Sequence, residues 1–177
     1  MTLLATVFDL DGALVDSAAT RVLSECVDGM ADAIARGTFG LRPGAADLVA
    51  LAGELGAVGL VSEAPRRYVR AAASASGILR HVQVVVSGED VANGKPAPDP
   101  YLAAARRLGL GPAQCLAVED SGPGIRSAHA AGMTVLAIPG ASADLDALGL
   151  AACRAADPRA AAKAMCRLWV DVYALSR

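Results

Sequence analysis

The chain has 177 residues and a formal net charge of −2, which suits one domain with at most a small appendage. Hydrophobic residues make up 54% and charged residues 19%, so the chain can bury a core and a largely disordered protein is excluded. The mean hydropathy is high, at +0.43, but no apolar run is long enough to span a membrane. The near-neutral charge argues against general nucleic-acid binding.

Two features favour a cytoplasmic protein. The first residues, MTLLATVFDLD, reach an acid at Asp9 with no basic residue before it, unlike a secretory signal. The four cysteines form no C-x-x-C pair, and we interpret them as thiols in a reducing compartment. The two histidines lie far apart in the sequence, so a zinc centre is not expected.

Short apolar runs alternate with alanine-rich segments of helical periodicity. The apolar runs predict strands at 3–8, 57–61, 82–86, 115–118 and 134–138. The periodic segments predict helices at 17–36, 45–55, 65–76, 99–108, 124–131 and 158–175. This alternation predicts a three-layer, Rossmann-like α/β fold, in which helices flank a central, mostly parallel sheet. The strands are almost wholly apolar, as expected of a sheet that is covered on both faces.

Polar side chains follow each of the first four predicted strands. They are Asp9 and Asp11 after the first, Ser62 after the second, Lys95 in the loop after the third, and Glu119 and Asp120 after the fourth. In this architecture ligands bind outside the carboxyl ends of the strands, so we expect these residues to converge. Four acids so close together would repel one another unless a cation lay among them, and oxygen ligands suit Mg²⁺.

A metal ion and an ammonium group at one site would suit an anionic phosphate group. A carboxylate there can act as a nucleophile and form an acyl-phosphate. A second acid, two residues further on, can give a proton to the leaving oxygen and later activate water. The convergence therefore favours phosphoryl-transfer chemistry.

Four segments carry these residues, and each resembles a motif of the haloacid dehalogenase superfamily in its phosphatase form. VFDLDGALVDS (7–17) resembles the first motif, Val61-Ser62 the second, GKPAPDPYL (94–102) the third and VEDSGPGIRSAHAAGM (118–133) the fourth. The last two look most like the β-phosphoglucomutase and phosphoglycolate phosphatase branch. The motifs occur in family order, and the resemblance implies a Mg²⁺-dependent phosphomonoester hydrolase that works through an aspartyl-phosphate.

The resemblance also implies roles for the matched catalytic residues. Asp9 would be the nucleophile and Asp11 the general acid/base. Ser62 would hydrogen-bond the transferring phosphoryl group, and Lys95 would neutralise charge on Asp9 and on the phosphoryl oxygens. The dehalogenases lack the second acid of the first motif, so Asp11 favours phosphoryl transfer over dehalogenation.

For the metal, the resemblance implies ligands from the first and fourth motifs. Asp9 would bind Mg²⁺ through its carboxylate and Asp11 through its backbone carbonyl. Asp120 is the implied carboxylate ligand of the fourth motif, with Glu119 as a second.

Other interpretations compete with these roles. Ser62 could cap a helix that begins near Pro65, and Glu119 and Asp120 could merely favour a helix N-terminus. The run 122–127 mimics the G-x-G-x-x-G pattern of dinucleotide sites, although the two acids before it would repel a pyrophosphate. At the level of function, the alternatives are a catalytically weak or inactive binding protein and, less favoured, a sugar-phosphate mutase.

Three departures from the family pattern bear on activity. Ala13 stands where the family usually has Thr, and Glu63 follows Ser62 where small polar residues are usual, so an inward Glu63 carboxylate would repel phosphate. Relatives usually insert a helical cap between the first two motifs, but only residues 16–41 remain for one here. We therefore expect one catalytic core domain over 1–177, with a residual cap segment at 16–41.

A minimal or absent cap bears on the substrate, because caps exclude water and recognise leaving groups. An open site would accept a bulky or macromolecular phosphorylated substrate as well as a small molecule. Alternatively, a second copy in a homo-oligomer would cover it.

Overall fold

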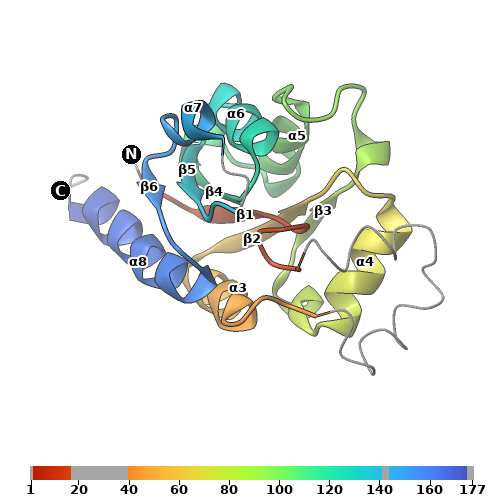
Figure 1. The fold of residues 1–177 in the computed structure, drawn as a ribbon, viewed down its shortest axis with the longest axis horizontal. Helices are drawn as coiled ribbons and strands as arrows, with labels where there is room; N and C mark the ends of the chain where they lie inside the picture. Colours follow the sequence, from red (N-terminus) through yellow and green to blue (C-terminus); the bar gives the residue numbers. More distant parts are fainter. Residues whose placement is uncertain (1, 17–39, 141–143, 175–177) are drawn as a thin grey trace.

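A parallel sheet of six strands forms the centre of the protein (Figure 1). The computed structural model describes residues 2–16, 40–140 and 144–174. The strands are β1 (Ala5–Asp9), β2 (Ala57–Val61), β3 (Val84–Val86), β4 (Cys115–Glu119), β5 (Thr134–Ala137) and β6 (Cys153–Arg154). They lie in the order β3-β2-β1-β4-β5-β6, and every neighbouring pair is parallel.

The helices form a layer on each face of the sheet (Figure 1). One layer contains α3 (Ala45–Leu55), α4 (Arg66–Ala75) and α8 (Pro158–Ala174), and the other contains α5 (Asp99–Leu108), α6 (Gly122–Ala130) and α7 (Leu145–Leu148). Short 3-10 helices occupy Ile78–His81, Gly88–Asp90 and Pro112–Gln114. The predicted three-layer, Rossmann-like fold is confirmed. None of the described helices combines the length and hydropathy that a membrane span requires.

Alternate residues of the central strands pack against opposite layers. Phe8 and Leu116 belong to the core cluster that contains residues of α3, α4 and α8. Val7 and Ala117 belong to the other cluster, with residues of α5, α6 and α7. Because both faces are covered, an apolar side chain is favoured at every position, which explains the continuous apolar runs in the sequence.

Most of the predicted elements are confirmed. The helices at 45–55 and 99–108 and the strand at 57–61 have the predicted bounds, and the other predicted elements that fall on described residues lie within about two residues of theirs. The sequence interpretation missed β6 and α7, which are two and four residues long and too short to show a periodicity. The helix predicted at 17–36 lies outside the described residues, as does all but the ends of the residual cap segment at 16–41.

The strand order reverses between β1 and β4, and the carboxyl edge between these two strands is the expected ligand crevice. From β1 the chain connects to β2 on one side, whereas β4 lies on the other side of β1 and leads to β5. Such a reversal of strand order is the point at which open α/β sheets bind ligands, outside the carboxyl ends of the strands. Asp9 and Glu119 are the last residues of β1 and β4, so both lie at this crevice.

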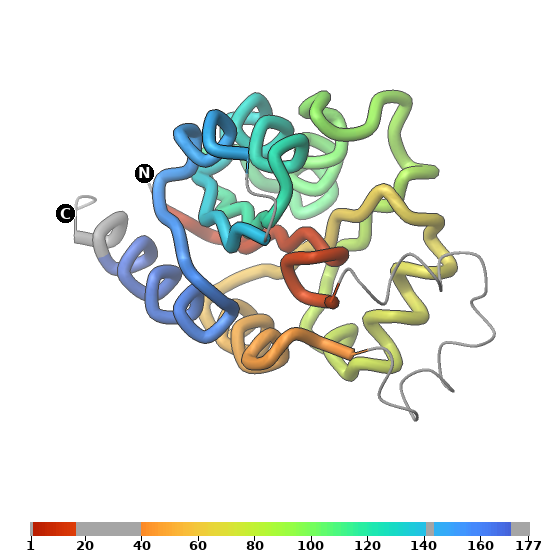
Figure 2. The backbone as a smooth tube through the Cα atoms, viewed as in Figure 1, coloured from red at the N-terminus to blue at the C-terminus, as the bar shows by residue number. Residues whose placement is uncertain are grey.

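Two segments meet beside the crevice. Val15 and Leu41 form an antiparallel bridge, and the Asp16 amide donates to the Gly40 carbonyl at 3.4 Å. Figure 2 shows the end of the red segment and the start of the orange segment close together. Residues 17–39 therefore leave and rejoin the described chain at neighbouring points.

The packing of β4 predicts a large effect of core truncation. Leu116 is 0% exposed, so Leu116→Ala should lower the free energy of unfolding by about 2–5 kcal/mol, through lost burial and a residual cavity. Leu145 is 78% exposed, and Leu145→Ala should change it by less than about 0.5 kcal/mol. Urea unfolding of both variants measures the difference, and equal effects would contradict the described packing.

Candidate active site

The six side chains selected from the sequence lie at the carboxyl edge of the sheet, and five of them form two hydrogen-bonded groups. Lys95 links Asp9 to Glu119, and Asp120 lies beside them; Ser62 bonds Asp11. Asp9 ends β1 and Glu119 ends β4, while the others lie in the loops that follow the strands. The predicted convergence is thus present, while the roles of the residues stay predictions.

Lys95 is the buried cation of the site. Its ammonium donates to Asp9 Oδ1 and to Glu119 Oε1, both at 2.5 Å, and its side chain is only 4% exposed. Burial by itself lowers the pKa of Lys95, but Asp9 and Glu119 outweigh burial and raise the pKa above its usual range. Lys95 is therefore charged at neutral pH.

Glu119 is held from several directions. Its Oε1 accepts from Lys95 and from the hydroxyl of Tyr101 at 2.5 Å. Its Oε2 accepts from the amides of Asp120 and Ser121 and from the Ser121 hydroxyl, at 3.1–3.3 Å. With both oxygens hydrogen-bonded, Glu119 fixes Lys95, and direct metal ligation by Glu119 stays a prediction.

Two carboxylate oxygens at the site have a different environment. Asp9 Oδ2 and Asp120 Oδ1 are buried, and within the part of the chain that the structure describes neither has a hydrogen-bond partner. Asp9, Glu119 and Asp120 offer ligand oxygens that lie within 4.8 Å of one another. A buried carboxylate oxygen without a donor is costly, and a hard divalent cation with oxygen ligands would satisfy both atoms. The residues therefore fit Mg²⁺, which Asp9 and Asp120 would bind directly.

Burial raises the pKa of two carboxyl groups at the site, Asp9 and Asp120. Burial raises the pKa of Asp9 well above its usual range; Lys95 acts against this rise, and Glu119 and Asp120 add to it. Burial, followed by the charge of Glu119, raises the pKa of Asp120 to about 6. A cation between Asp9 and Asp120 would lower both values.

Asp11 is held by two hydroxyl groups. Ser62 Oγ donates to Asp11 Oδ2 at 2.7 Å, and the hydroxyl of Tyr68, a buried residue of α4, donates to Asp11 Oδ1 at 3.1 Å. Ser62 Oγ also accepts from the Ala64 amide at 3.1 Å. A serine has one hydroxyl proton, so Ser62 must turn from Asp11 before it can donate to a phosphoryl oxygen.

Glycines allow the carboxylates to approach the backbone closely. Gly12 has a φ of +102°, which favours glycine, and a Cβ at this position would collide with the carboxylate of Asp120. A Cβ at Gly124 would likewise collide with Glu119. The first turn of α6 is therefore occupied by a carboxylate of this chain, which contradicts the dinucleotide interpretation of 122–127.

Ser62 and Glu63 lie between β2 and α4, and the structure bears on the interpretation of both. The helix-cap interpretation of Ser62 is wrong, because the residue that precedes α4 is Pro65 and Ser62 Oγ bonds Ala64 instead. Glu63 is exposed, and its carboxylate lies close to Gly94, the residue before Lys95.

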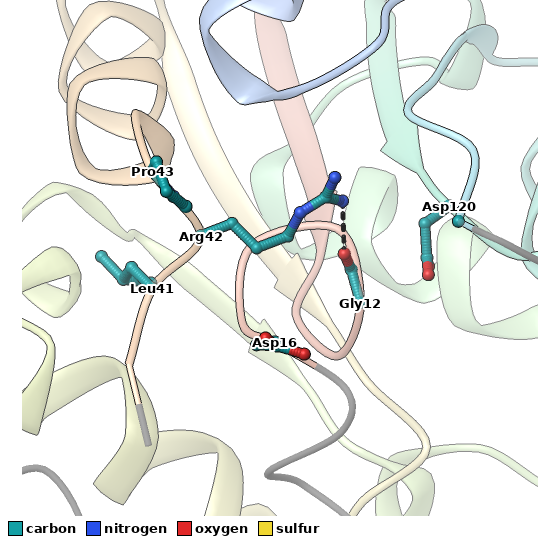
Figure 3. Close-up of a pocket in the computed structure, with 7 residues that line it drawn as sticks. Gly12, Asp16, Leu41, Arg42, Pro43 and Asp120 are labelled. Carbon is teal, nitrogen blue, oxygen red and sulfur yellow. Dashed lines mark hydrogen bonds between the residues drawn. The ribbon is translucent and has the colours of Figure 1, made fainter. Parts of the chain in front are cut away.

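The sequence interpretation missed three residues, Tyr68, Tyr101 and Arg42. Tyr101 lies within the third motif. The available signal was its hydroxyl group, because a tyrosine hydroxyl needs a hydrogen-bond partner when it is buried, as it is here. Tyr68, the third residue of α4, carried the same signal. Arg42 donates through Nη1 to the carbonyl of Gly12 at 2.7 Å and lines a cavity beside Asp120 (Figure 3). Nothing in the local sequence marks Arg42.

Comparison with known proteins gives one family. A model of haloacid dehalogenase-like hydrolases matches residues 30–132, more than half of the chain. Protein CbbY of Rhodobacter capsulatus is 44% identical over 110 residues, which cover 60% of this chain and 48% of that protein. Phosphoglycolate phosphatase of Escherichia coli (strain K12) is 41% identical over 114 residues, which cover 63% of this chain and 45% of that protein. The chain thus spans about half the length of these curated relatives.

Solved structures share the fold. The crystal structure of CbbY from Rhodobacter sphaeroides in complex with phosphate has a TM-score of 0.75 and 22% identity, and the match covers 88% of this chain and 95% of that one. A HAD phosphatase from Thermococcus onnurineus has a TM-score of 0.71 and 18% identity, with 86% and 93% covered. At these identities the likeness concerns the fold alone.

The partnerless oxygens predict that Mg²⁺ stabilises the protein in a pH-dependent way. A raised carboxyl pKa means that the folded state holds its proton more tightly than the unfolded state, so protons compete with the metal below about pH 6. At ten times its Kd, Mg²⁺ should raise the unfolding midpoint by roughly 3–6 °C. The rise should be larger at pH 7.5 than at pH 5.

Thermal unfolding with and without Mg²⁺ measures this effect. Asp120→Asn should remove most of the rise, whereas Asp146→Asn, the same change at an exposed position, should keep it. A rise that is equal in both variants would contradict the metal site.

Proposed function

The chain belongs to the haloacid dehalogenase-like hydrolase family, and from this premise we propose that it is a Mg²⁺-dependent phosphomonoester hydrolase that forms an aspartyl-phosphate on Asp9. One observation carries the proposal. Asp9 is a buried carboxylate with the Lys95 ammonium on one oxygen and no partner, among the described residues, on the other. Such a group is positioned to bind a metal and to attack an electrophile that approaches from the crevice.

In the first step, an Asp9 carboxylate oxygen attacks phosphorus, and the bond from phosphorus to the leaving oxygen breaks. Asp11, in its protonated form, gives its proton to that leaving oxygen. Lys95 remains on Asp9 and offsets the negative charge that collects between the nucleophile and the phosphoryl group. The products are a free alcohol and an aspartyl-phosphate.

In the second step, the Asp11 carboxylate takes a proton from water as that water attacks the aspartyl-phosphate. The bond between phosphorus and the Asp9 oxygen breaks, which releases inorganic phosphate and restores both aspartates. Bound by Asp9 and Asp120, with the Asp11 carbonyl as a further predicted ligand, Mg²⁺ would supply positive charge against the repulsion between carboxylate and phosphate.

Two hydroxyl groups are assigned supporting roles. Ser62 donates to a phosphoryl oxygen once it turns from Asp11, and Tyr68 then keeps Asp11 in place through its own bond of 3.1 Å. Glu119, held by Tyr101, keeps Lys95 directed at Asp9.

The substrate, partners and location form part of the same proposal. We propose a phosphorylated substrate, either a small molecule or a bulky or macromolecular one, and a second copy of the chain as the cover of the site. No role for nucleic acid or membrane is proposed. A cytoplasmic location rests on the cysteines, which form no C-x-x-C pair.

The nucleophile is tested by Asp9→Asn. The amide is a far weaker nucleophile, so hydrolysis of 4-nitrophenyl phosphate in the presence of Mg²⁺ should fall by ~10⁴-fold or more. Wild-type protein quenched in acid during turnover should carry phosphate on Asp9, detected by mass spectrometry.

The same experiment separates the alternatives. A wild-type protein as inert as Asp9→Asn on a panel of phosphate esters with Mg²⁺ would favour a binding protein without efficient catalysis. Transfer of phosphate to a second sugar hydroxyl, rather than to water, would favour a mutase.

The hydrogen bond to Asp11 makes Tyr68→Phe a test of proton transfer. The variant should lower kcat/KM for ethyl phosphate by about 3- to 10-fold, the worth of one such hydrogen bond. The value for 4-nitrophenyl phosphate should change less than about 2-fold, because nitrophenolate leaves without a proton. Equal losses on both esters would show that Tyr68 serves the structure alone.

A further inference from the structure

Arg42 is fixed at the edge of the crevice by its backbone and by its side chain. Its amide donates to the Leu14 carbonyl at 2.8 Å, next to the bridge between Val15 and Leu41. Its guanidinium Nη1 donates to the Gly12 carbonyl at 2.7 Å. Figure 3 shows the side chain extended over the loop of Gly12, with its guanidinium directed toward the side on which Asp120 lies.

Three described arginines are paired with carboxylates, whereas the charge of Arg42 acts on Asp120 without a direct ion pair. Arg66, Arg107 and Arg126 each pair with a carboxylate at 3.0 Å or less. Within the ranges that the structure describes, Arg42 has no such ion pair. Its side chain makes one hydrogen bond, which uses one of the five N–H donors of the guanidinium. A half-buried guanidinium with spare donors is suited to a planar or tetrahedral anion.

The cavity that Arg42 lines adjoins the proposed metal site. It has a volume of about 330 Å³ and also contacts Gly12, Asp120 and Gly140. This volume is at the lower end for ligand pockets, so it suits a small leaving group. Asp16 lines the same cavity, but it is exposed, so water and salt weaken its repulsion of an anion.

We infer that Arg42 binds a second anionic group, carried by the leaving group of the phosphoester, and so selects substrates with two anions. This inference rests on the proposed function, since it takes the transferring phosphoryl group to lie at Asp9. Of the two substrate sizes proposed above, it selects the small molecule. The second anion is a carboxylate or a phosphate, because a guanidinium binds both in the same way.

A matched pair of esters tests the inference. 2-Phosphoglycolate and ethyl phosphate have leaving groups of similar size, but only the first carries a carboxylate. Arg42→Gln should lower kcat/KM for 2-phosphoglycolate about 10- to 100-fold more than for ethyl phosphate, the range for a hydrogen bond to a charged group. Propane-1,3-diol bisphosphate and propyl phosphate form a second pair, which distinguishes a phosphate from a carboxylate.

Two further variants serve as controls. Arg67→Gln makes the same change on an exposed position of α4 and should leave both pairs unchanged. Arg42→Lys keeps the charge without the planar donor set and should fall between wild type and Arg42→Gln. Circular dichroism shows whether each variant is folded.

The outcomes are distinct. A selective loss in either pair supports the inference and identifies the second anion. An equal loss on esters with and without a second anion, or no loss on either ester that carries one, overturns it.

Failure of the proposed function is recognised separately. The four esters are also titrated by calorimetry, with Mg²⁺ present, into Asp9→Asn and into Asp9→Asn combined with Arg42→Gln. A selective loss of affinity for an ester with a second anion in the double variant supports the inference, even where the wild type hydrolyses none of the esters. Equal affinities in the two proteins overturn it.

Discussion

The ammonium of Lys95, buried between Asp9 and Glu119, is the interaction on which the site depends. Two carboxylates at the ends of neighbouring strands could not both stay ionised in the protein interior without a cation between them. One ammonium does not balance all the acids present, since Asp120 and Asp11 lie beside the pair. Under the proposed function, a divalent cation would offset the remaining negative charge, and an anionic substrate could then bind in the same crevice.

The rest of the site divides into groups that are held and atoms that are left without a partner. Hydroxyl and amide donors occupy both oxygens of Glu119 and both oxygens of Asp11. Asp9 Oδ2 and Asp120 Oδ1 receive none from the described residues. Fixing the supporting groups in advance means that little reorganisation is needed when charge develops at Asp9.

The sequence was sufficient for the fold and for residues that follow a strand directly, because parallel strands bring their carboxyl ends to one edge. It was insufficient to identify the partners of Tyr68 and Arg42, which are Asp11 and Gly12 and lie 57 and 30 residues away. Such contacts depend on how α4 and the segment before α3 pack, which no local pattern encodes. The two-residue strand β6 was missed for a related reason, since its pairing with β5 defines it rather than its own composition.

The bridge between Val15 and Leu41 has a consequence for how such a protein can diversify. Because the chain leaves and re-enters the core at paired residues, the two ends of the connection between them are already held side by side. The entropic cost of a longer connection grows only with the logarithm of its length, about 0.6 kcal/mol for each doubling. The junction between Val15 and Leu41 therefore tolerates connections of different length, while the sheet and its buried charges stay as they are.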